Sequence, residues 1–130
     1  MVDGLILCFL DEDSATESFL EELQSHIALV NISWHMDKPN IPSVMIDVCE
    51  GICKSSRHVL SIGHKNVAYI GGPEHSKISI QKLSGFKKAL ESDNTRINEK
   101  NILQLTNYSL SQSYLSAQKL IMSKSSPSAI

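Results

Sequence analysis

Three side chains that commonly bind zinc lie close together in the sequence. Cys49 and Cys53 are four residues apart, and His58 follows five residues later. On a helix the two cysteines share one face, whereas His58 lies about 140° around the axis from Cys53. Zn²⁺ takes four ligands in a tetrahedral arrangement, and no fourth candidate follows nearby. The spacing therefore favours buried, apolar cysteines over a metal site, and we expect no metal or cofactor.

A pair of glycines lies where a strand is expected to end. Gly71-Gly72-Pro73 follows a strand pattern and precedes a helical one. Backbone N–H groups in such a turn can bind phosphate, but neither a G-x-G-x-x-G motif nor a P-loop is present. A tight turn at the carboxyl end of the strand is the favoured interpretation.

Two polar residues remain as candidates for chemistry. Asp47 ends a predicted strand, where its carboxylate either accepts hydrogen bonds from a sugar or nucleobase or caps the next helix, and one residue can do both. His64 has no paired carboxylate or hydroxyl nucleophile at a recognisable spacing. Because no nucleophile motif occurs elsewhere, the sequence predicts a protein that is not an enzyme.

The elements that must position these residues alternate between strands and helices. The apolar run 4–9 is typical of a strand buried on both faces, and Ser14 with Glu17 has the spacing of a capping box. This alternation predicts an α/β fold with parallel sheets flanked by helices. Strands are predicted at 4–9, 27–32, 43–47, 67–70, 102–105 and from Ser128, with helices marked by Phe19 to Leu23, Val48 to Leu60, Leu83 to Leu90 and Tyr114 to Ile121.

Parallel α/β sheets bind ligands at the carboxyl ends of their strands. That rule points to Asp47, to residues 72–82 and to the loop after Leu105. The segment Asp37–Pro42, which contains two prolines, is the best candidate for a boundary between two lobes. Both ends of the chain lie in strand patterns, so we expect a truncated domain.

Composition excludes several classes of partner. Twelve Lys and Arg against 14 Asp and Glu leave a formal charge of −2, without the basic stripe that contacts nucleic acid or an anionic membrane. No apolar run reaches the roughly 18 residues of a membrane span, and no signal peptide precedes the first strand. Three cysteines, an odd number, fit reduced thiols in the cytoplasm.

A longer series of residues is more specific. The segment IPSVMIDVCEGICKSSRHVLSIGHKNVAYIGGP, followed by KLSGFKKAL, resembles the lactose/galactose repressor (LacI/GalR) family. The family pattern has an Asp after a strand, a Gly four residues later, H-L, G-H-x-x-I-A-x-I-x-G-P and R-L-x-G-F. Three shorter segments also match the family. Near the start of the chain, Val2-Asp3-Gly4-Leu5-Ile6 is similar to the family's V-D-G-I-I. Further on, Tyr108-Ser109 with Tyr114 is similar to its F-x-x-x-x-G-Y, and Pro127-Ser128-Ala129-Ile130 is similar to its P-T-A-I.

The resemblance implies a partial, two-lobed sensor domain of the type I periplasmic-binding-protein-like fold. Residues 1–45 would form part of the N-terminal lobe, and residues 46–130 the crossover and the first half of the C-terminal lobe. The helix-turn-helix headpiece of the family is absent, so operator DNA would be bound only through that missing part. The full-length protein would be a cytoplasmic homodimer.

The resemblance also implies an effector site, carried over residue by residue. Asp47 matches the family's crossover Asp, which lies beside the effector. Lys82 occupies the place of an effector-binding Arg, and it replaces a planar, bidentate group with a flexible point charge. Ser76, on the loop after Pro73, would line the cleft.

The function implied is sensing of a sugar or nucleobase effector for a LacI-type, DNA-binding transcription regulator. The alternative is a stand-alone sugar-binding or self-associating α/β module without DNA binding. Because the cleft would be only half built, we expect no measurable effector binding by this chain in calorimetric titrations.

Overall fold

The computed structural model describes residues 2–8, 14–32 and 41–130, and the side chains of residues 14–17 also lie outside the described part. Contacts divide the chain into two compact units, Met1–Ile46 and Asp47–Ile130. The boundary expected at Asp37–Pro42 lies too early, because Ser43 and Val44 still pair with a strand of the first unit.

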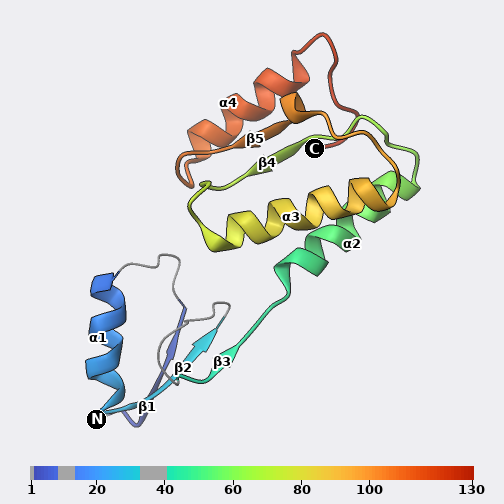
Figure 1. Ribbon diagram of the computed structural model, residues 1–130. Helices are drawn as coiled ribbons and strands as arrows, with labels where there is room; N and C mark the ends of the chain where they lie inside the picture. The colour runs from blue at the N-terminus through green and yellow to red at the C-terminus, as the bar shows by residue number, and fades with distance from the viewer. Residues whose placement is uncertain (1, 9–13, 33–40) are drawn as a thin grey trace. The chain divides into compact units, whose positions relative to one another are not determined.

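In its described residues, the first unit has a three-stranded parallel sheet and one helix (Figure 1). Strands β1 (Gly4–Leu7), β2 (Ala28–Ile32) and β3 (Ser43–Val44) lie in that order, and α1 (Ser14–Gln24) connects the first two. Leu20 of α1 is fully buried against Leu29 and Ile41, and half-buried leucines of β1 join this cluster. One face of the sheet therefore carries the core of this unit.

Some expectations for the first unit were wrong. We expected the 4–9 run to be buried on both faces, but Ile6 is 73% exposed and burial alternates along β1. The physical reason is that β1 is an edge strand and α1 packs on one face only. The strand expected at 43–47 ends at Val44, and Phe19 is exposed. The side chains of the expected capping box, Ser14 and Glu17, are not described, and residues 33–40 lie outside the described part of the chain.

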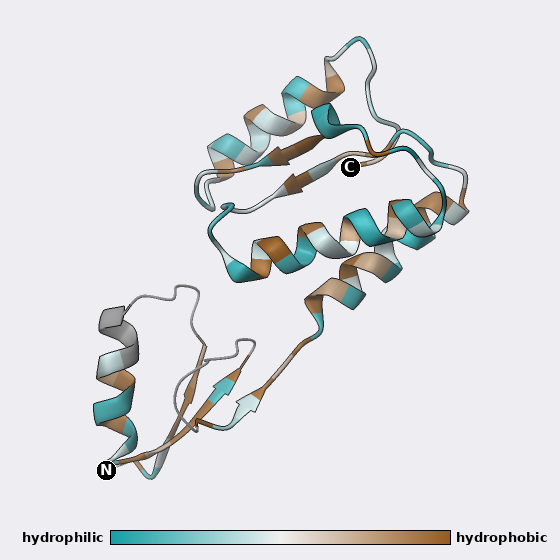
Figure 2. Ribbon diagram, in the orientation of Figure 1, coloured by the Kyte–Doolittle hydropathy of each residue, from teal (hydrophilic) through white to brown (hydrophobic). Residues whose placement is uncertain are grey.

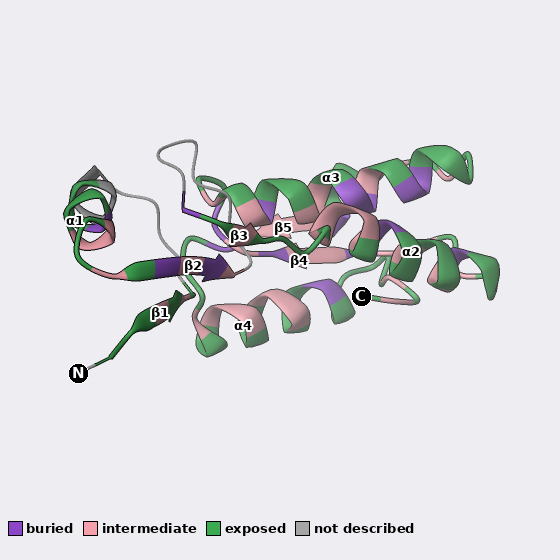
Figure 3. Ribbon diagram, turned by 90° about the horizontal axis from the view of Figure 1, so that it is seen from below, coloured by how far each residue is buried: buried purple, intermediate pink, exposed green. Residues whose placement is uncertain are grey.

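The second unit has helices on both faces of a parallel sheet (Figures 1 and 3). Residue Ala129 adds a parallel bridge to Val67, which agrees with the short strand expected at the end of the chain. Helices α2 and α3 pack together on one face, and α4 lies on the other. The elements are α2 (Val48–Ser61), β4 (Tyr69–Gly71), α3 (Lys77–Ser92), the 3₁₀ turn η1 (Glu99–Asn101), β5 (Ile102–Gln104) and α4 (Leu110–Ile121).

The core of the second unit forms where α2 and α3 meet the sheet. Cys53 and Ala89 are fully buried there, with Leu60, Phe86 and Leu90 nearly so. The brown bands of β4 and β5 in Figure 2 follow this apolar centre. Parallel sheets flanked by helices are thus confirmed. Of the two cysteines that the sequence expected to be buried, Cys53 is buried and Cys49 is only half-buried.

A buried amide cluster attaches the end of the chain to the sheet. Asn101 Nδ2 donates to Asn66 Oδ1 at 2.8 Å and to the Val67 carbonyl at 3.1 Å. Asn66 Nδ2 in turn donates to the carbonyls of Ser125 and Ser126, and the Ser128 N–H donates to the Asn66 carbonyl. His64 Nδ1 lies 2.9 Å from Ser128 Oγ, which is a structural role for this histidine. Ala129 is thereby placed beside Val67.

Candidate functional site

A groove opens at the carboxyl ends of β4 and β5. Because the two strands are parallel, the loops that leave Gly71 and Gln104 meet at one edge of the sheet. The groove has a volume of about 580 Å³. Its lining combines apolar, hydroxyl and backbone groups, contributed by Ile52, Tyr69, Ile70, Gly71, Gly72, Ser79, Lys82, Leu105, Tyr108, Ser109, Leu110 and Ser113. We call this space the carboxyl-end groove.

Hydroxyl groups from the start of α3 and from the loop between β5 and α4 meet at the carboxyl-end groove. Tyr108, on the loop between β5 and α4, places its hydroxyl 3.1 Å from Ser79 Oγ and 3.3 Å from Ser76 Oγ. Ser76 is the N-cap residue of α3, but its side chain makes no capping hydrogen bond. The predicted site residue Ser76 therefore contacts the hydroxyl of Tyr108, and with Ser79 these form a hydroxyl cluster, but Ser76 is not among the described residues that line the groove.

Gly72 allows this close approach of α3 and the loop that carries Tyr108. A Cβ atom at this position would lie 2.5 Å from both Ser79 Oγ and Tyr108 Cε1. Any side chain would therefore have to displace the serine or the tyrosine. The glycine that the sequence assigned to a tight turn is thus also required by the packing of the hydroxyl cluster.

Lys82 lies one helical turn beyond Ser79 on α3 and faces the same groove. Its side chain is half-buried. Among the lining residues that the structure describes, Lys82 alone carries a charge. The groove thus offers one ammonium group beside several hydroxyl groups.

Asp47 has a different environment from Ser76 and Lys82. Its carboxylate accepts a hydrogen bond from the Glu50 N–H at 2.8 Å and caps α2. It does not end a strand as expected, because β3 stops at Val44. Asp47 is also exposed and is not among the described residues that line the carboxyl-end groove. The capping role that the sequence left open is therefore the one observed in this structure.

Tyr69 forms the floor of the groove and packs on the core. Its ring centroid lies 5.2 Å from that of Phe86. Burial raises the pKa of Tyr69, and the nearby Tyr108 adds to that rise. The phenol of Tyr69 therefore stays neutral, as a hydrogen-bonding group rather than an ionised one.

Sequence reasoning located this region but missed individual residues. Ligands bind at the carboxyl ends of parallel strands, and this rule pointed to residues 72–82 and to the loop after Leu105. Residues from both segments line the groove. It did not single out Ser79, Tyr108 or Ser113 as site residues. A helical wheel could have placed Ser79 and Lys82 on one face of α3, but no local signal places Tyr108 over them.

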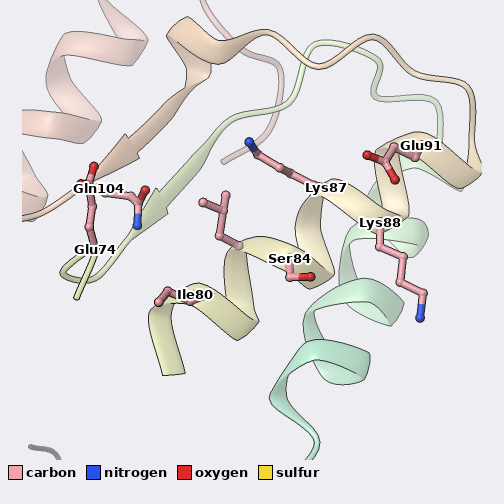
Figure 4. A pocket seen from close by; sticks show the side chains of 8 residues that line it. Glu74, Ile80, Ser84, Lys87, Lys88, Glu91 and Gln104 are labelled. Atoms are coloured by element: carbon pink, nitrogen blue, oxygen red, sulfur yellow. The ribbon is translucent and has the colours of Figure 1, made fainter. Parts of the chain in front are cut away.

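Two other hollows differ in character from the groove. Figure 4 shows a surface depression of about 740 Å³ along α3, where Lys87, Lys88 and Glu91 surround exposed surface. Lys87 there pairs with Glu99 at 3.4 Å, an exposed ion pair that contributes little to stability. A third, apolar hollow of about 420 Å³ lies between α2, β4 and Ala129. The second of these is lined mainly by apolar side chains, with Ser55, Ser56 and Tyr69 adding hydroxyl groups, and it carries no charged side chain among the described residues that line it.

The described part of the chain contains neither a cluster of metal ligands nor a membrane-spanning helix. Within residues 2–8, 14–32 and 41–130, His, Cys, Asp and Glu side chains form no group of three or more that could hold a metal ion. No helix in that part of the chain is both long and apolar enough to cross a membrane.

Comparisons with known proteins agree on one family. The model described as periplasmic binding proteins and sugar binding domain of the LacI family matches residues 1–130. The transcriptional regulator DegA of Bacillus subtilis is 36% identical over 132 residues, and the transcriptional repressor PurR of Escherichia coli is 27% identical over 130. Each match covers 99% of this chain but only 38% of the relative, so the chain spans well under half of their length.

Solved structures show the same fold. The transcription regulator CcpA of Lactococcus lactis superposes with a TM-score of 0.74 at 26% identity, over 92% of this chain and 43% of that one. A regulatory protein of the LacI family from Chloroflexus aggregans gives a TM-score of 0.81 at 22% identity, over 99% of this chain and 46% of the other. The second likeness concerns the fold alone.

Proposed function

The chain belongs to the LacI family of periplasmic-binding-protein-like domains, and from this we propose that it is the effector-sensing part of a transcription regulator. The observation that carries the proposal is the family match over residues 1–130, together with a hydroxyl-lined groove at the carboxyl ends of parallel strands. DegA and PurR are named as transcriptional regulators, which supports a regulatory rather than an enzymatic role.

We assign the two compact units to the two lobes of the sensor. Residues 1–45 would be part of the N-terminal lobe, and residues 46–130 would be the crossover and the first half of the C-terminal lobe. The division observed at Ile46 and Asp47 supports this assignment. Operator binding would require a headpiece that these residues do not contain, and the protein would act in the cytoplasm, where its operator is.

The effector would be a sugar or a nucleobase, held in part by Lys82 and Ser76. The hydroxyl cluster and the single ammonium group of the carboxyl-end groove support this choice, because both bind the oxygen atoms of such ligands. Asp47 would join the site only if its carboxylate accepted a second hydrogen bond, from the ligand, while it keeps the bond from the Glu50 N–H. A carboxylate has enough lone pairs to accept both.

The full-length protein would act as a homodimer. The apolar side chains of Leu115 and Ile121 on α4 and of its C-cap residue Met122 are exposed, which supports self-association. The same exposure favours the second candidate function, a stand-alone, self-associating module. The mass of the natural polypeptide separates the two, because an antibody against residues 47–90 would detect 14.4 kDa for a short module and far more for a complete regulator.

The sensing role is tested by transcript sequencing in the source cells on a panel of sugars and purines. Deleting the gene should deregulate a small set of transcripts. A Lys82→Ala strain should fail to respond to the inducing compound, whereas Lys88→Ala, which alters an exposed lysine of the same helix, should behave as the parent. Unchanged transcripts in the deletion strain would reject the proposal.

A further inference from the structure

The charge in the carboxyl-end groove has one sign. Lys82 is half-buried, and it is the one charged side chain among the described residues that line the groove. Lys65 of the same unit lies 2.7 Å from the Asp93 carboxylate, which balances its charge. Lys82 forms no such ion pair with a carboxylate in the described part of the chain. Its positive charge is therefore available to a ligand in the groove.

Two helices begin at this groove and add positive charge to it. The first residue of α4, Leu110, and its N-cap residue Ser109 line the groove, as does Ser79 in the first turn of α3. The N-terminus of a helix carries a partial positive charge, which an acidic side chain in the first turn offsets. Helix α2 has Glu50 in that place, whereas α3 and α4 have no acidic residue in their first turns.

The acidic side chains near these elements in the sequence lie elsewhere. Glu74, which precedes α3, lines the depression shown in Figure 4 together with Gln104, and it is not among the described residues that line the groove. Asp47 is exposed and caps α2. No carboxylate of the described lining therefore repels an anion from the groove.

We propose that the effector of the carboxyl-end groove is a sugar phosphate, whose phosphate group pairs with the Lys82 ammonium. The inference rests on the proposed function, because it names the class of effector for the same groove. The hydroxyl groups of Ser79, Ser113 and Tyr108 in the lining suit the hydroxyl groups of the sugar. The groove volume of about 580 Å³ lies within the range of small-molecule sites.

A phosphate group suits this charge pattern better than a carboxylate or an uncharged group. A phosphate monoester carries about two negative charges at neutral pH and has three acceptor oxygens. It thus has one acceptor for the ammonium and one for each helix N-terminus, whereas a carboxylate has only two oxygens. A neutral sugar would displace water from Lys82 without supplying an opposite charge. The phosphate group should therefore raise the affinity.

The test compares D-ribose 5-phosphate with D-ribose by NMR titration of the whole chain in a phosphate-free buffer. Shifts of the Ser79 and Ser109 amides register binding even in the millimolar range. The Kd for ribose 5-phosphate should be about tenfold lower than that for ribose, the effect of a charge-assisted hydrogen bond. The ratio should shrink as salt is added, because salt screens the charges. Inorganic phosphate should bind more weakly than ribose 5-phosphate, because it lacks the sugar hydroxyl groups.

Three variants assign the effect to the lysine charge. Lys82→Met keeps an unbranched apolar side chain but removes the charge, so it should bind the two sugars equally. Lys82→Arg keeps the charge and should retain the preference, which separates a lost charge from a disturbed helix. Lys88→Met changes an exposed lysine of α3 that does not line the groove, and it should match the parent.

Equal affinity of the parent for the two sugars, a preference that survives in Lys82→Met, or no shift with either compound would overturn the proposal. Inorganic phosphate that binds as tightly as ribose 5-phosphate would also overturn it. The transcript experiment tests the function separately. A regulator with a neutral effector would pass that experiment and fail this one, whereas unchanged transcripts would reject the function whatever the ratio of the two affinities.

Discussion

Gly85 of α3 packs directly against the carbonyl group of Cys49 on α2. A Cβ atom at position 85 would overlap the Cys49 carbonyl oxygen and lie 3.0 Å from its carbon. The contact is to backbone, which cannot rotate away as a long side chain can. The two helices can therefore approach this closely only because residue 85 has no side chain.

Gly85→Ala should lower the free energy of unfolding by about 1–3 kcal/mol, the usual cost of overpacking a close contact. Chemical denaturation measures it. Gly51→Ala is the matched control, because Gly51 lies on the exposed side of α2 with nothing within 4 Å. That change should stabilise the protein by about 0.5–1 kcal/mol. Equal effects of the two substitutions would show that the helices do not pack this way.

Asp47→Ala should lower the free energy of unfolding by about 1 kcal/mol, because the N–H of Glu50 loses its capping partner. Asp47→Asn keeps a side-chain oxygen at the cap, so it should leave stability nearly unchanged while removing the charge. Thermal unfolding of the three proteins measures this. An equal loss in both variants would mean that the charge rather than the hydrogen bond stabilises α2.

Asn101→Ala should cost about 1–3 kcal/mol of unfolding free energy, since the part-buried Val67 carbonyl and Asn66 side chain each lose a donor. Amide hydrogen exchange should show the largest loss of protection at Ala68 and Ser128, whose N–H groups join the chain end to the sheet. Asn107→Ala, an exposed position, is the control. Protection that stayed unchanged at Ser128 would contradict the role of this cluster.

The pKa of Asp93 should depend on Lys65. The Lys65 ammonium lies 2.7 Å from the Asp93 carboxylate and lowers its pKa, with a second contribution from the Thr95 hydroxyl. Because the folded pKa is the lower one, the stabilisation is present above about pH 4 and is lost as pH falls through the folded value.

Lys65→Met should move the pKa of Asp93 back up toward the ordinary value, as NMR titration of the carboxyl carbon would show. Lys54→Met, which removes an exposed lysine beside Glu50, should not. An Asp93 pKa that stayed unchanged in Lys65→Met would assign the shift to Thr95 instead.

The order of elements was predictable from the sequence because each depends on neighbours along the chain. The apolar stripe from Val48 to Leu60 and the glycine at 63 placed α2 correctly, since helical periodicity and a left-handed residue after the helix are local properties. The family was also predictable, because its motifs occupy fixed spacings around Asp47 and Gly72 and the family model matches the chain.

Two features depended on the tertiary structure, because they depend on contacts between distant residues. Ile6 lies in an apolar run, yet it is exposed because helix packing covers one face of β1 only. Tyr108 and Ser79 are 29 residues apart, and only the parallel pairing of β4 with β5 brings the Tyr108 loop close to the start of α3. Local pattern therefore determined which elements form, and long-range packing decided which side chains share the groove.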